Sequence, residues 1–138
     1  LYGTTLAAAI VTPKWTMAIQ IGDGDAVFVD GKTVTHPIPH DDRLLGNETT
    51  SLSLREAELD FRLYARFGDP PTLVMLATDG YKNSFRDDAG FVQAALDLLG
   101  ALDEDGAEDV SEALPDWLAE TSQDGSGDDI SVGLIWSV

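Results

Sequence analysis

The pattern of apolar and polar positions predicts a series of short strands, then helices, then a last strand. Every second residue over 15–21 is apolar, which is the period of a half-buried strand. Residues 4–11 and 72–77 are nearly continuous apolar runs, which are typical of buried strands. This order favours an α+β fold. Further strands are predicted over 25–29, 33–35, 59–65 and 130–136.

Glycine-containing turns separate the second, third and fourth predicted strands. Gly22-Asp23-Gly24 lies between two of them, and Asp30-Gly31 is a common type I′ hairpin turn. We therefore expect an antiparallel meander over residues 4–35. Residues 36–47 contain two prolines and many polar residues, and we expect a loop there.

Two helical patterns follow the strand that ends at residue 77. Apolar residues recur at helical spacing over 91–99, with Asp87 or Asp88 placed to begin the helix and Gly100 placed to end it. Residues 103–106 are predicted to be an acidic linker. The second pattern, over 110–118, contains Pro115, which is compatible with one kinked helix or with two short ones.

Acidic residues lie at the ends of predicted strands in three places. These are Asp23 between two glycines, Asp79 before Gly80, and the pair Asp128-Asp129. Each alone is compatible with an ordinary surface turn. Together they predict an oxygen-lined site for Mg²⁺ or Mn²⁺, because strand ends are rigid and glycine lets the backbone approach closely.

Five segments, taken in order, resemble the protein phosphatase 2C family of metal-dependent Ser/Thr phosphatases. The resemblance covers nearly the whole chain but only the C-terminal half of the family's domain, so we expect residues 1–138 to be the C-terminal part with the N-terminal part absent. It implies an α+β layered sandwich of two mainly antiparallel β-sheets flanked by α-helices. The segments are Gly3-Thr4-Thr5-Leu6, Ala18-Ile19-Gln20-Ile21-Gly22-Asp23, Asn47-Glu48-Thr49-Thr50, Leu76-Ala77-Thr78-Asp79-Gly80 and Asp128-Asp129-Ile130-Ser131-Val132.

The resemblance also implies a reaction and a set of ligands. The reaction is hydrolysis of phosphoserine or phosphothreonine in a protein substrate by a metal-activated water, with two or three Mg²⁺ or Mn²⁺ ions and a cognate Ser/Thr kinase as a further partner. Asp79 and Asp128 match ligands of one ion, and Asp23 matches a weaker, further site. The bridging carboxylate, the phosphate-binding arginine and the general acid belong to the missing half. We therefore expect the fragment alone to be inactive.

Two departures from the family pattern keep other functions open. Gly24-Asp25 stands where the family usually has Ser-Arg, and Asn83 replaces an acid often found four residues after the position of Asp79. A non-catalytic phosphatase-like interaction module is the alternative, and a strand ending in Asp-Gly before residue 1 would favour the enzyme. A calcium-dependent structural domain is a third candidate, although Asp23 and the acids of residues 103–106 lack EF-hand spacing.

Composition narrows the domain number, binding partners and location that we expect for the chain. A length of 138 residues suits one domain, and a net charge of −17 argues against binding nucleic acid or anionic membranes. The chain has no cysteine and no apolar run near the roughly 20 residues that span a bilayer. We expect a soluble, cytoplasmic protein. His36 and His40, each beside a proline, are predicted to be exposed rather than catalytic.

Overall fold

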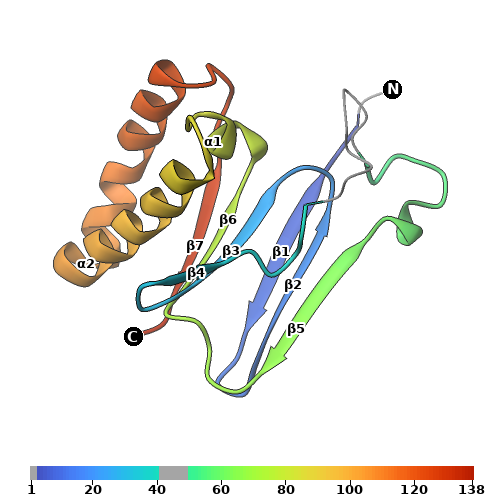
Figure 1. Ribbon diagram of the computed structural model, residues 1–138, viewed down its shortest axis with the longest axis horizontal. Helices are drawn as coiled ribbons and strands as arrows, with labels where there is room; N and C mark the ends of the chain where they lie inside the picture. The colour runs from blue at the N-terminus through green and yellow to red at the C-terminus, as the bar shows by residue number, and fades with distance from the viewer. Residues whose placement is uncertain (1–2, 41–49) are drawn as a thin grey trace.

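Two antiparallel sheets stack on each other in the computed structural model, which describes residues 3–40 and 50–138 (Figure 1). The first sheet has the order β1 (Leu6–Val11), β2 (Trp15–Ile21) and β5 (Arg62–Phe67). The second has the order β4 (Thr33–Thr35), β3 (Asp25–Asp30), β6 (Leu73–Ala77) and β7 (Val132–Trp136). The predicted α+β sandwich is confirmed. Residues 47–49 of the third resemblance segment lie outside the described residues.

The link between β2 and β3 crosses from one sheet to the other, so the predicted single meander is wrong. β2 pairs with β1 and β5, whereas β3 pairs with β4 and β6. Gly22 has a φ of 96°, which glycine adopts easily and other residues do not. The Gly-Asp-Gly segment therefore turns the chain out of the first sheet and places Asp23 at one end of the sandwich.

Two helical segments follow β6, α1 (Asp79–Asn83) and α2 (Asp88–Asp124). The Asp87 carboxylate accepts a 3.0 Å hydrogen bond from the Gly90 amide, which confirms the predicted helix start. The predicted end at Gly100 is wrong, since Gly100 is helical. The break lies at Gly106, where φ is 85°, and not at Pro115, which lies inside the second helix.

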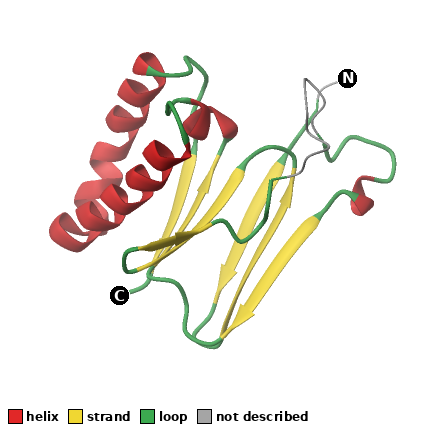
Figure 2. Ribbon diagram, viewed as in Figure 1, coloured by secondary structure: helices red, strands yellow, loops and turns green. Residues whose placement is uncertain are grey.

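The predicted acidic linker over residues 103–106 contains the break at Gly106 but is too long, because residues 103–105 continue the first helix of α2. The apolar pattern runs past Gly100 to Leu102, which is buried, and this packing outweighs the roughly 1 kcal/mol by which glycine disfavours a helix. Figure 2 shows the two helices of α2 on the same side of the second sheet. No helix among the described residues is long and apolar enough to cross a membrane.

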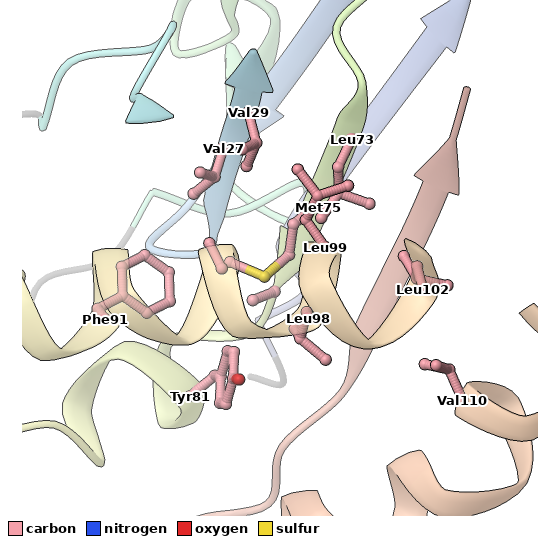
Figure 3. Packing of buried hydrophobic residues seen from close by; sticks show 12 residues of the cluster. Val27, Val29, Leu73, Met75, Tyr81, Phe91, Leu98, Leu99, Leu102 and Val110 are labelled. Carbon is pink, nitrogen blue, oxygen red and sulfur yellow. The ribbon is translucent and has the colours of Figure 1, made fainter. Parts of the chain in front are cut away.

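The main hydrophobic core lies between the second sheet and α2 (Figure 3). A second, smaller core lies between the sheets and contains Phe28, Val74 and Ala18. Among the described residues, no helix covers the side of the first sheet that faces away from the second sheet, and β1 is half-exposed rather than buried as predicted. Buried residues of the main core include Val27, Val29, Leu73, Met75, Phe91, Leu98, Leu99, Leu102 and Val110.

Candidate metal-binding site

Asp79 lies where β6 ends and α1 begins, beside the residues that lead into β7. The Thr78 amide donates a 3.0 Å hydrogen bond to the Ser131 carbonyl. The Ser131 amide in turn donates to the Thr78 hydroxyl at 2.9 Å. These bonds hold the segment before β7 against the segment after β6. The acidic pair Asp128-Asp129 is thereby brought to the start of α1.

Gly80 is the point at which the two acidic segments touch. A β-carbon at Gly80 would lie 2.7 Å from the Asp129 carbonyl oxygen and 3.2 Å from the Asp128 β-carbon. The shorter of these contacts is one that a real side chain would not tolerate, so the glycine permits the close approach. Glycine at position 80 is therefore a packing requirement, and Asp128 and Asp129 lie against the residue that follows Asp79.

Three serines that the sequence analysis did not single out hold the turn at Asp128. The hydroxyls of Ser84 and Ser126 both donate to the Gly80 carbonyl, at 2.7 and 3.0 Å. Ser126 Oγ also accepts a hydrogen bond from the Asp128 amide at 3.2 Å, and the Ser122 hydroxyl donates to the Asp128 carbonyl at 2.6 Å. The backbone of Asp128 is thus fixed on both sides.

Asp23 reaches the same end of the sandwich through the link between β2 and β3. A β-carbon at Gly24 would lie 3.0 Å from the Ala77 carbonyl oxygen, so the link packs against the end of β6. The Gln20 side-chain amide donates to the carbonyl oxygens of the glycines on either side of Asp23. The segment that carries Asp23 is therefore fixed close to Asp79.

The charges of Asp23 and Asp128 both act on the Asp79 carboxyl. Burial raises the pKa of Asp79, and the charge of Asp23 and then that of Asp128 raise it further. The Gly80 amide donates a 2.9 Å hydrogen bond to the Asp79 carboxylate, and this lowers the pKa. Ionised carboxylates in this arrangement repel each other, and a divalent cation would relieve the repulsion.

The three aspartates alone do not make a complete metal site. Within residues 3–40 and 50–138, no three acidic or histidine side chains come close enough together to hold an ion. Asp23 and Asp79 line one cleft, whereas Asp128 is exposed and lines a different hollow beside the C-terminal half of α2. Their carboxylate oxygens fit Mg²⁺ or Mn²⁺ chemically. Further ligands would be needed to enclose either ion.

The cleft that Asp23 and Asp79 share has a volume of about 640 Å³. His40 is exposed as predicted, but His36 is half-buried, with its ring centroid 6.0 Å from that of Phe91. Half-burial of His36 could not be read from a polar, proline-rich segment. Basic side chains that line the cleft are His36, His40, Arg62 and Lys82.

Comparison with known families identifies the fold. A family model described as protein phosphatase 2C matches residues 1–119. The chain belongs to the protein phosphatase 2C family. No curated protein matches the chain.

Solved structures of phosphatases share the fold of this phosphatase 2C chain. A bacterial serine phosphatase has a TM-score of 0.63 at 14% identity, with 94% of this chain and 56% of that chain covered. The phosphatase domain of SpoIIE from Bacillus subtilis has a TM-score of 0.58 at 15% identity, with 96% and 57% covered. The Mycobacterium tuberculosis serine/threonine phosphatase PstP/Ppp has a TM-score of 0.59 at 17% identity, with 96% and 58% covered. This chain therefore spans little more than half the length of these proteins.

Asp25, which departs from the usual phosphatase 2C pattern, has a cationic partner in the fold. Burial raises the pKa of the Asp25 carboxyl, and Lys82 opposes this effect. Lys82 Nζ lies 3.6 Å from Asp25 Oδ1. Asn83, the second departure from the family pattern, lines the cleft that Asp23 and Asp79 share.

Proposed function

We propose that the chain forms part of a metal-dependent protein Ser/Thr phosphatase. Asp79 and Asp128 would bind one Mg²⁺ or Mn²⁺ ion of the two or three in the whole domain, and Asp23 would contribute to a weaker site. The observation that carries this assignment is the close approach of the two acidic segments at Gly80. Family membership supports the reaction class, and one matching SpoIIE structure comes from a crystal presoaked with Mn.

The residues of this chain would bind and orient the metal ion rather than take part in the chemical step themselves. A bound divalent ion in this class of reaction polarises the phosphate and lowers the pKa of the attacking water. Asp79 offers its carboxylate from the rigid junction of β6 and α1, and the serine hydrogen bonds fix the backbone from which Asp128 extends. The substrate would be a phosphorylated protein, with a cognate kinase and a cytoplasmic setting as further parts of the proposal.

We also propose that the 138 residues are the C-terminal part of the phosphatase domain. The chain spans 56% to 58% of the three phosphatases described above. The bridging carboxylate, the phosphate-binding arginine and the general acid would come from the N-terminal part. The 138-residue chain alone is therefore expected to show little or no activity on an aryl phosphate with Mn²⁺.

A non-catalytic phosphatase-like interaction module is the second candidate function. It is favoured by the incomplete set of metal ligands among the described residues and by Asp25 in place of an arginine. A strand ending in Asp-Gly ahead of residue 1 in the parent sequence would support the enzyme. Its absence would support the module.

Substitutions in a polypeptide that contains the whole domain test the enzymatic proposal. Asp79→Asn and Asp128→Asn should each lower hydrolysis of a phosphoserine peptide at least about 100-fold, because loss of groups that merely support a ligand already lowers metal affinity 10–100-fold. Asp23→Asn should have a milder effect. Asp105→Asn, on the exposed surface of α2, is the control. Near-normal activity of Asp79→Asn at limiting Mn²⁺ would refute its role.

A further inference from the structure

Lys82 lies between two carboxylates in the wall of the cleft. Its Nζ is 3.6 Å from Asp25 Oδ1 and 3.3 Å from Asp88 Oδ1, and it lies 5.7 Å from the ring centroid of Phe91. The Asp25 side chain is only 16% exposed. A carboxylate withdrawn from water to this extent needs a cationic or hydrogen-bonding partner. The start of β3, α1 and the start of α2 therefore meet at one ammonium group.

The two partners of this ion pair lie next to the proposed metal ligands in the sequence. Asp25 follows Asp23 by two residues, and Lys82 follows Asp79 by three within the same short helix. We propose that the Lys82–Asp25 ion pair positions the cation site, holding the segment that carries Asp23 against the helix that begins with Asp79. This inference rests on the proposed function, because it assumes that these aspartates bind a divalent ion.

Charge repulsion alone and the positioning role predict opposite changes in Mn²⁺ affinity when Lys82 is lost. A positive charge near a cation site repels the ion, so its removal alone should tighten Mn²⁺ binding about twofold to fourfold at low salt. If Lys82 positions the site, its removal leaves Asp25 without the ammonium group that contacts it and loosens the Asp23 segment against α1. Mn²⁺ binding should then weaken about tenfold, as it does when groups that orient metal ligands are lost.

The test is Mn²⁺ titration of the 138-residue chain at constant ionic strength, with free Mn²⁺ measured by electron paramagnetic resonance. Lys82→Met should weaken binding about tenfold, and Lys82→Arg, which keeps the ion pair, should stay within about twofold of wild type. Lys32→Met removes the same charge from the exposed β3–β4 turn and should cause no weakening. Binding by Lys82→Met that equals or exceeds wild type would overturn the proposal.

Two further variants keep the result interpretable. The double variant Asp25→Asn with Lys82→Met has no buried unpaired charge, so it serves as the test if Lys82→Met alone fails to fold. Weaker Mn²⁺ binding by this double variant would support the positioning role. Binding equal to that of wild type would overturn it. Asp79→Asn separates the two hypotheses. If Asp79→Asn binds Mn²⁺ as wild type does, the proposed metal site fails together with this inference. If Asp79→Asn loses binding and Lys82→Met does not, only the positioning role is wrong.

Discussion

The outer faces of the two sheets are similarly apolar but lie in different surroundings. In the second sheet, the outward side chains of β3 and β6 lie beneath α2, and Val27, Val29, Leu73 and Met75 are at most 1% exposed. In the first sheet, the strand register puts every second side chain of β1, β2 and β5 on the outer face. The exposed members of that face, between 40% and 87% exposed, are Leu6, Ile10, Leu63 and Phe67.

The contrast is clearest along β2, where two polar residues are buried while three large apolar ones are not. Thr16 and Gln20 point between the sheets and are 0% and 4% exposed, whereas Trp15, Met17 and Ile19 are half-exposed on the outer face. Apolar patches of this kind usually mark a surface that another element covers. The proposed N-terminal part of the domain would account for it. Within the described residues, α2 therefore buries the outer face of the second sheet, whereas the outer face of the first sheet needs a further element to bury it.

The strongest way to test this contrast is to remove one phenylalanine ring from each face. Phe91 is fully buried and packs against the rings of Tyr81 and Phe85, whereas Phe67 is 87% exposed. Phe91→Ala should lower the free energy of unfolding by about 3–5 kcal/mol. Phe67→Ala should change it by no more than about 0.5 kcal/mol. Urea denaturation measures both, and similar losses would show that the face of the first sheet is covered in solution.

A second pair of variants tests whether the two acidic segments are in contact at Gly80. Gly80→Ala places a methyl group against the Asp129 carbonyl oxygen and should lower the free energy of unfolding by about 1–3 kcal/mol. Gly100→Ala, where the new methyl group meets nothing within 4 Å, should raise it by up to about 1 kcal/mol. Thermal unfolding at matched salt measures both. No loss at Gly80 would mean that the two acidic segments are not in contact.

The smallest expected effect concerns an ion pair that joins the two sheets. Arg66 of β5 donates to both carboxylate oxygens of Asp30 of β3, at 2.8 and 2.9 Å, and this hydrogen bonding lowers the pKa of Asp30. The folded-state pKa lies below the unfolded value, so the stabilisation is present above that unfolded value. It is lost as the pH falls through the folded pKa.

Asp30→Asn should therefore destabilise the chain at pH 7 by no more than about 1 kcal/mol, because both side chains are partly exposed. The difference from wild type should shrink towards zero as the pH falls through the lowered pKa of Asp30. Denaturation over a pH series measures this, with Glu104→Gln on exposed α2 as the control. A difference that does not change with pH would exclude the ion pair as its cause.

Local patterns were sufficient to predict most elements but not their partners. The buried strand β6 was predicted because its apolar run reflects burial on both faces. The assignment of β2 and β3 to different sheets was not, because Gly22-Asp23-Gly24 has the composition of a hairpin turn and pairing depends on distant strands. The two helices of α2 were predicted to be separated by a linker over residues 103–106, but only Gly106 is non-helical there, since tertiary packing decides which helical glycine is tolerated.

The candidate site shows the same limit. Asp79, Asp128 and Asp23 were singled out because acids at strand ends form a recognisable pattern and match positions in the family's segments. Lys82 and the serines that fix the Asp128 turn were missed, because their roles depend on contacts between distant segments. Ser84 and Ser126, for example, are 42 residues apart and share one carbonyl acceptor.

The most direct test of the central claim, that Asp79 and Asp128 serve one cation, is the melting temperature of the 138-residue chain with and without Mn²⁺. Millimolar Mn²⁺ should raise it modestly, because the gain grows only with the logarithm of ion concentration over the dissociation constant. Ionic strength must be matched, since a net charge of −17 makes the fold sensitive to any salt. The double variant Asp79→Asn with Asp128→Asn should lose most of the rise. An equal rise in this double variant would mean diffuse charge neutralisation and would contradict a shared site.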